Sequence, residues 1–385
     1  MTSILSSEEI GEAVKWRHHL HRNPELGFEE TGTSAFIAGR LAEWGYAVRT
    51  GYGRTGLVGS LSRGASARAI GIRADIDALP IQEQTGLPYA SGRPGKMHAC
   101  GHDGHVSMAL AAARAVSRLD FDGTVHFIFQ PAEENEGGGR AMVEDGLFRD
   151  IAMDDIYALH NWPALDLGRC VARDDRMMAA FGTFEIKVRG RGAHGAMPHE
   201  GADPIVAAAQ IVSGLQSIAS RNVSPLQAAV VSATQIHGGD AWNVIPEDVV
   251  IRGTTRWFEE EVGAKIEARL RALATTVAAG FDCAAEVDYL FRYPATINDP
   301  RCAAIVRRTA EAMPGMEVAD AMPSMAAEDF AFMLREKPGC YFWLGARRPG
   351  NNPGLHSAYF DFNDDLLPLG ARMWVSLVEG QLKAA

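Results

Sequence analysis

Residues 69–80 read Ala-Ile-Gly-Ile-Arg-Ala-Asp-Ile-Asp-Ala-Leu-Pro, so a short apolar run ends in two aspartates, Asp75 and Asp77. Such a run, bounded by polar positions, is typical of a strand buried in a sheet. Ligands of open α/β sheets gather at the carboxyl ends of the strands, so we expect similar stretches to meet there in one crevice. Three further stretches join apolar residues to metal-compatible side chains: 98–105 (His-Ala-Cys-Gly-His-Asp-Gly-His), 129–134 (Phe-Gln-Pro-Ala-Glu-Glu) and 158–161 (Ala-Leu-His-Asn).

The N-terminal third alternates helical patterns with strand-like runs. Apolar residues recur at helical spacing between 7 and 20, between 35 and 44, and between 106 and 113. Strands alternating with helices predict an α/β fold, in which a mostly parallel sheet is flanked by helices. The strand-like runs fall at 56–59, 69–72, 125–129 and 156–159.

The middle of the chain has a different order of elements, β-α-β-β-α-β, which predicts a ferredoxin-like α+β domain. We place this domain at residues 179–290. It would be inserted into a discontinuous catalytic, metal-binding domain of residues 1–178 and 291–385, and would serve as a lid and dimerisation domain. The expected strands are 184–188, 228–236, 249–257 and 285–293, and the expected helices are 204–219 and 259–279.

Composition limits the classes of partner and the compartment. The formal net charge of -11 over 385 residues argues against nucleic acid and anionic membranes as partners, because both would repel the average surface. No apolar run is long enough to cross a bilayer, and the first residues lack the layout of a signal peptide. The five scattered cysteines do not form a disulfide framework, so we expect a cytoplasmic protein.

The four stretches supply thiolate, imidazole and carboxylate side chains, and Leu355-His356-Ser357 near the C-terminus adds another imidazole. This mixture suits zinc and neighbouring divalent transition metals better than calcium or magnesium. Glu133 and Glu134 are adjacent in an extended segment, where successive side chains point in opposite directions. One of the two carboxylates can therefore bind metal while the other faces the substrate.

These motifs together resemble the aminoacylase/carboxypeptidase family of two-metal hydrolases. The branch most similar contains hippurate hydrolase, bacterial N-acyl-amino-acid amidohydrolases and plant indole-acetyl-amino-acid hydrolases. The matching motifs keep their order and span nearly the whole chain. They lie at 20–28, 73–80, 98–105, 130–134, 192–199, 243–246, 253–256, 328–330 and 360–364.

The resemblance implies metal-dependent hydrolysis of the amide bond of a small N-acyl amino acid. It implies two divalent ions, most simply manganese or zinc, with nickel or cobalt as further candidates. Glu133 falls on the general acid/base, while Asp75 and Asp77 are expected behind the ligands. The five positions that would bind the metals are Cys100, His102, Glu134, His160 and His356.

Three residues of the inserted domain are candidates for contacts to the substrate. His194 would stabilise the oxyanion, and Asn243 is a weaker candidate for the same task. Arg256 would pair with the substrate carboxylate, although a structural ion pair is an alternative. Since His194 belongs to the inserted domain, the site would be completed by closure of that domain or by the partner subunit of a homodimer.

Other interpretations remain open at this stage. Cys100 and His102 could form a nucleophilic thiol and its base, but their spacing in a tight turn is poor for that chemistry, and Glu133 would have no task. A structural metal site would need only four ligands. A metallo-exopeptidase acting on dipeptides would use the same metals and base. Two departures from the family pattern, Ala327 for a serine and Ala358 for a proline, remove no ligand.

Overall fold

The computed structural model describes residues 5–134, 136–350 and 352–384. The chain forms two compact units. The sheet unit comprises Met1–Met177, Thr296–Met322 and Asp329–Ala385, and the inserted unit comprises Met178–Ala295 with Pro323–Glu328. Because the last strand of the inserted unit runs to Tyr293, the expected border at Leu290 falls inside a strand. Among the described helices, none has the length and apolar character needed to cross a membrane.

The sheet unit is built on an eight-stranded sheet, which confirms the predicted α/β fold with a mostly parallel sheet. Its central strands β4, β3, β5 and β16 are parallel to one another. Their carboxyl ends therefore meet at one edge, where Asp75 pairs with Gln130 and His160 with Trp343. In sheet order the strands are β1 (Ala47–Tyr52), β2 (Gly56–Arg63), β4 (Gly123–Gln130), β3 (Ala69–Asp75), β5 (Asp155–Asp166), β16 (Gly339–Arg347), β6 (Arg169–Val171) and β15 (Glu317–Val318).

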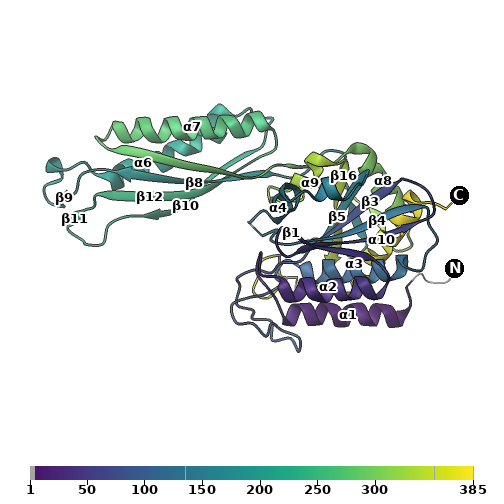
Figure 1. Ribbon diagram of the computed structural model, residues 1–385. Helices are drawn as coiled ribbons and strands as arrows, with labels where there is room; N and C mark the ends of the chain where they lie inside the picture. The colour runs from purple at the N-terminus through teal and green to yellow at the C-terminus, as the bar shows by residue number, and fades with distance from the viewer. Residues whose placement is uncertain (1–4, 135, 351, 385) are drawn as a thin grey trace. The chain divides into compact units, whose positions relative to one another are not determined.

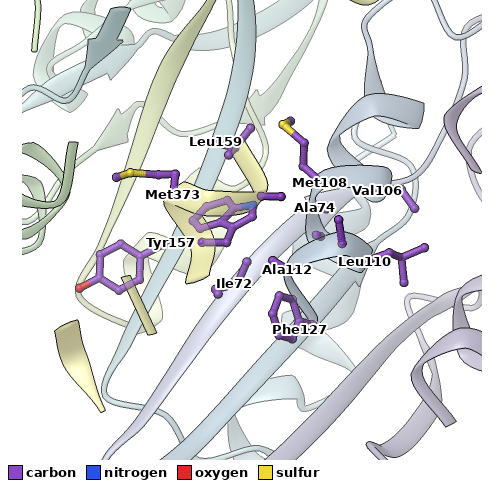
Figure 2. Close-up of a cluster of buried hydrophobic side chains, with 14 of the residues drawn as sticks. Ile72, Ala74, Val106, Met108, Leu110, Ala112, Phe127, Tyr157, Leu159 and Met373 are labelled. Carbon is purple, nitrogen blue, oxygen red and sulfur yellow. The ribbon is translucent and has the colours of Figure 1, made fainter. Parts of the chain in front are cut away.

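Helices flank this sheet, and their apolar residues form the larger core. Figure 2 shows Ile72, Phe127 and Tyr157 from the strands beside Leu110 of α3 and Met373 of α10. Nearly every residue of α3 is buried, so its first residue is held firmly at the edge of the sheet. The helices of this unit are α1 (Ser7–Arg22), α2 (Thr31–Glu43), α3 (His102–Val116), α4 (Gly138–Glu144), α5 (Leu147–Asp150), α8 (Pro300–Glu311), α9 (Ala331–Glu336) and α10 (Leu367–Gln381).

The inserted unit has the predicted β-α-β-β-α-β order. Its sheet is antiparallel with strand order β10-β12-β8-β13, and Figure 1 shows both helices on one face of it. Asp203 caps α6 by accepting from two backbone amides, as the Asp-Pro pair predicts. The elements are β8 (Ala180–Arg189), α6 (Pro204–Ser217), β10 (Ala229–His237), β12 (Asp248–Trp257), α7 (Glu260–Ala279) and β13 (Ala284–Tyr293).

Short ladders complete the fold. Strand β9 (Ala193–His194) pairs with β11 (Val244–Ile245) in the inserted unit. Strand β7 (Arg176–Met178) pairs with β14 (Thr296–Ile297), close along the chain to two of the connections between the units.

Candidate metal centre

Three of the predicted ligands meet where β5 and the start of α3 come together. The Sγ atom of Cys100 lies 3.3 Å from Nε2 of His160. A ligand atom of His102 belongs to the same group, in which all the atoms lie within 4.8 Å of one another. The loop reaches α3 through Gly101, whose φ of 96° is a left-handed conformation that suits glycine. An added Cβ at Gly101 would also lie 2.4 Å from Asn161 Oδ1, so the turn requires a residue without a side chain.

The other two predicted ligands come from distant parts of the chain. Glu134 follows β4, and its Oε1 lies 3.1 Å from Nε2 of His356. Both side chains form a group with Cys100 within the same 4.8 Å limit. The backbone N–H of His356 donates to Ala99 O at 2.8 Å, which ties the C-terminal loop to the cysteine turn. His356 itself has a φ of 64°, a strained conformation for a non-glycine residue and one that clusters at functional sites.

One buried atom of this group, Nε2 of His102, has no hydrogen bond within the described part of the chain. Buried polar atoms are normally satisfied, so this nitrogen, beside a thiol, two further imidazoles and a carboxylate, requires an explanation. A divalent cation bound by these side chains would satisfy it. The donor set of one sulfur, three imidazoles and a carboxylate also suits zinc, manganese and similar ions. The residues therefore fit a metal centre.

Asp75 and Asp77 lie behind the candidate ligands, at the end of β3. Nδ1 of His102 lies 2.9 Å from Asp77 O and 3.2 Å from Asp77 Oδ1. This contact directs Nε2 of His102 toward the other ligands, as expected for a metal-binding histidine. Asp75 Oδ1 lies 2.6 Å from Nδ1 of His105, and its Oδ2 accepts from Arg73 at 2.8 Å. Asp75 could instead be a ligand itself, since it forms a group with His102 and His105.

The charges of these groups are strongly coupled. Burial alone would raise the pKa of Asp75, but the charges of His102, His105 and Arg73 hold it well below its usual value. Burial opposes protonation of His102, yet Asp75 and Asp77 raise the pKa of its imidazole to about 10. Burial, with the nearby Glu134 and Glu133, raises the pKa of the Cys100 thiol well above its ordinary value. Without a cation, this thiol therefore remains protonated at neutral pH.

Glu133 lies in the turn Pro131–Glu134 that follows β4, and it is buried. A carboxylate oxygen of Glu133 lies within 4.8 Å of ligand atoms of both His102 and Glu134. The backbone N–H of Glu134 donates to Asp77 Oδ2 at 2.9 Å, so the aspartate that orients His102 also fixes this turn. Glu133 therefore stands beside the candidate ligands and can serve proton transfer.

The predicted substrate contacts lie in the inserted unit and fall at opposite ends of it. His194 and Asn243 are exposed neighbours, because His194 pairs with Val244 and Gly195 N–H donates to Asn243 O at 2.7 Å. Arg256 is half-buried near the end of β12, where its guanidinium stacks on Phe181 with 4.5 Å from Cζ to the ring centroid.

Further residues of the quoted motifs form contacts around the candidate site. His105 Nε2 lies 2.6 Å from Asn161 Oδ1, which anchors the residue after the candidate ligand His160. Beneath Asp75, Arg73 donates to Gln130 at 2.8 Å, and Gln130 donates to Asp329 at 2.6 Å. A buried arginine inside an apolar strand was the available signal for this second network, since such a charge needs buried partners.

Two histidines of the quoted motifs, His21 and His98, are buried in the packing of the sheet unit. His21 Nδ1 lies 2.8 Å from Asp103 Oδ2. Burial would lower the pKa of His21, but Asp103 and Glu83 raise it to about 9. His98 is buried, and burial lowers its pKa to about 4. Both histidines are therefore part of the packing around the candidate site.

A cavity of about 300 Å³ is lined by residues that flank two of the candidate ligands. Asn161 follows His160, while Pro353 and Tyr359 lie on either side of His356 along the chain. Leu87 and Phe360 add apolar wall. Cavities of this size and mixed character are typical of small-molecule sites.

Comparisons with known proteins agree with one another. The sequence profile of peptidase family M20/M25/M40 matches residues 71–380. Hippurate hydrolase of Campylobacter jejuni is 38% identical over 97% of this chain and 97% of its own length. N-acetyl-L-cysteine deacetylase of Bacillus subtilis is 41% identical, over 93% of this chain and 84% of its own. A crystal structure from Bacillus subtilis, titled a dinuclear metal binding peptidase from the M20 family, superposes with a TM-score of 0.84 at 33% identity, and covers 99% of this chain and 100% of that one.

Proposed function

Because this chain belongs to peptidase family M20/M25/M40 and is a metal-dependent hydrolase of N-acyl amino acids, we propose that Cys100, His102, Glu134, His160 and His356 hold two divalent ions and that Glu133 is the general acid/base. The observation that carries this proposal is the convergence of these six side chains from four separate stretches of the chain. The metal groups share Cys100, which combines with His102 and His160 and also with Glu134 and His356.

The ions would act as Lewis acids and would lower the pKa of a bound water to about 7. Glu133 takes the proton of the attacking water as the acyl carbonyl becomes tetrahedral. It then delivers that proton to the amide nitrogen as the C–N bond breaks, so the acyl carboxylate and the free amino acid leave. Its buried position beside His102 and Glu134 supports this task, because the proton is kept from bulk solvent. Manganese or zinc is the proposed metal, with nickel and cobalt as alternatives.

We further propose a homodimer formed through the inserted unit, in which His194 completes the site of the partner subunit. The position of Arg256 supports this arrangement. The stretch Asp248–Arg256 of β12 corresponds to roughly 25 Å of extended strand, and His194 lies beyond its far end. One inserted unit cannot place both side chains on one small substrate, whereas two copies can. His194 and Asn243 would then stabilise the oxyanion, and Arg256 would bind the carboxylate.

Substrate specificity tests the proposed function. Purified, metal-loaded protein would be assayed with acetyl, benzoyl and indole-acetyl derivatives of one set of amino acids, together with dipeptides of the same residues. We expect kcat/KM to be highest for an N-acyl amino acid. Faster cleavage of the dipeptides would instead support the metallo-exopeptidase, which has the same ligands and base. Hydrolysis of none of them by protein with two bound ions would contradict both functions.

A further inference from the structure

The turn that carries Glu133 and Glu134 has an unusual backbone. Ala132, the residue before the pair, has a φ of 50° and is fully buried. Residues other than glycine seldom adopt this left-handed conformation, and they persist in it only where surrounding contacts impose it. The conformation of Ala132 sets the direction in which Glu133 and Glu134 leave β4. Whatever holds Ala132 therefore controls where both carboxylates lie.

Several hydrogen bonds hold this turn, and three of them involve the backbone of Ala132 or Glu134. The N–H of Ala132 donates to Oε1 of Glu30 at 2.8 Å, and its carbonyl accepts from Gly138 N–H at 2.9 Å. The N–H of Glu134 donates to Asp77 Oδ2 at 2.9 Å. Gly138 lies beside the turn, and Asp77 lies next to the candidate metal ligands. Glu30 comes from the loop that leads into α2, about a hundred residues earlier in the chain.

Glu30 is itself rigidly placed. The residue is fully buried, and its second oxygen, Oε2, accepts from Thr55 Oγ1 at 2.6 Å. The loop that carries it also packs directly on the turn, since an added Cβ at Gly27 would lie 3.1 Å from Ala132 Cβ. Both oxygens of the Glu30 carboxyl are thus held: one by Thr55, just before β2, and the other by the turn that carries Glu133 and Glu134. The hydrogen bonds described for this carboxyl are to the neutral groups of Thr55 and Ala132, and its burial opposes its ionisation.

We propose that Glu30 is a positioning residue, which fixes the Ala132 N–H and so aims Glu133 and Glu134 at their places in the metal centre. This inference rests on the proposed function of those two glutamates. Glu30 does not touch the candidate ligands in the described contacts; it acts through the backbone of Ala132. The arrangement works with either protonation state, because a protonated Oε2 can donate to the Thr55 hydroxyl while Oε1 still accepts from Ala132.

The test compares Glu30→Ala with Glu30→Gln in metal-loaded protein. Glu30→Ala leaves the Ala132 N–H without its acceptor, so the turn can relax. We expect kcat to fall about a hundredfold, as small displacements of catalytic groups do, while KM for an N-acyl amino acid stays within about twofold. Glu30→Gln should restore kcat to within a few-fold of wild type, because its amide oxygen accepts from Ala132 and its NH₂ donates to Thr55.

Glu25 provides the matched control. It lies in the same loop, and its carboxylate also accepts from two backbone amides, those of Gly32 at 3.0 Å and Thr33 at 2.8 Å. These amides belong to the first turn of α2 and not to the catalytic turn. Glu25→Ala should therefore lower the melting temperature and leave kcat unchanged. If Glu30→Ala behaves like Glu25→Ala, Glu30 is only structural and the proposal is wrong.

Two further variants test the proposal if Glu30→Ala does not fold or if the assignment of Glu133 is wrong. If Glu30→Ala does not fold, Thr55→Val removes only the second contact of the carboxyl and should lower kcat several-fold at constant KM. Unchanged kcat in that folded variant overturns the proposal, as does failure of Glu30→Gln to recover activity. Glu133→Gln is measured in parallel: if it stays active, the assignment of Glu133 fails, whatever the Glu30 variants show.

Discussion

Nε2 of His160 lies 3.3 Å from Sγ of Cys100, although α3, β4, α4 and α5 separate the two residues along the chain. Burial raises the pKa of the thiol and lowers the pKa of this imidazole, so the pair is neutral without a metal. Metal binding requires a thiolate and a neutral imidazole. The imidazole is therefore already in the form that binds a metal. The thiol must lose its proton when the metal binds, and the positive charge of the ion would favour this loss.

Cys100→Ala should remove bound metal and not only a nucleophile, because both candidate metal groups that share Cys100 lose a ligand. Metal analysis by mass spectrometry checks this result. Cys302→Ala is the control: Cys302 is equally buried but lies in α8, and its loss should lower stability while two ions remain. Full occupancy by two ions in Cys100→Ala would point away from ligation by the thiolate.

Glu133→Gln should keep its metal and its fold, yet lose activity by about a hundred- to ten-thousandfold, because an amide cannot carry the proton. Steady-state kinetics with metal analysis on the same sample measures both properties. Glu29→Gln, which changes an exposed glutamate paired with Lys96 at 2.8 Å, should have no effect on turnover. Turnover near the wild-type level in Glu133→Gln would rule out Glu133 as the base.

Removal of metal by a chelator should abolish hydrolysis while leaving most of the secondary structure intact. The reason is that both units have extensive apolar cores, so the fold does not depend on the ions as a small zinc domain does. Activity and far-ultraviolet circular dichroism followed together test this expectation. Adding back manganese or zinc should restore turnover. Collapse of the dichroism signal on chelation would indicate a structural metal instead.

His194→Ala should lower turnover strongly and leave both ions in place, since His194 belongs to the inserted unit. If sites are completed across a homodimer, mixing His194→Ala with Glu133→Gln subunits should restore part of the activity that neither parent has. Subunit exchange is verified with two affinity tags. A hybrid that stays inactive would confine His194 to its own chain or remove it from the mechanism.

Glu30 should make the stability of the protein fall as the pH rises. Burial, with the charge of Asp77, raises its pKa to about 7 from an ordinary value of 4.5. The folded protein therefore binds a proton more tightly than the unfolded chain does, and the favourable contribution present below pH 4.5 is lost progressively up to about pH 7. At one pKa unit for about 1.4 kcal/mol, the loss reaches roughly 3 kcal/mol.

Comparison of wild type with Glu30→Gln isolates this effect, because every other titrating group is shared. Relative to wild type, the variant should gain stability as the pH rises from 4.5 to about 7 in denaturant titrations. A difference between the two proteins that is independent of pH would show that Glu30 keeps an ordinary pKa.

The pattern of residues predicted much of the fold. Apolar runs that end in polar side chains, such as 69–80, predicted parallel strands and the edge at which their ends meet, and β3, β4 and β5 confirm this arrangement. The element order of the inserted unit was equally readable, because helices and strands differ in the period of their apolar residues. The expected border at Leu290 lies inside β13, although the apolar pattern itself predicts a strand at 285–293.

The sequence by itself therefore determined the fold class, the family and the chemical kinds of side chain at the centre, because these depend on local periods and short motifs. Only the tertiary structure decided which groups meet: His160 beside Cys100, Arg73 beneath Asp75, and Glu30 against Ala132. The strand order and the path of each loop bring these residues together across long stretches of chain. The hydrogen-bond partner of a buried polar group is determined by tertiary packing. The spacing of apolar residues along the chain does not specify that partner.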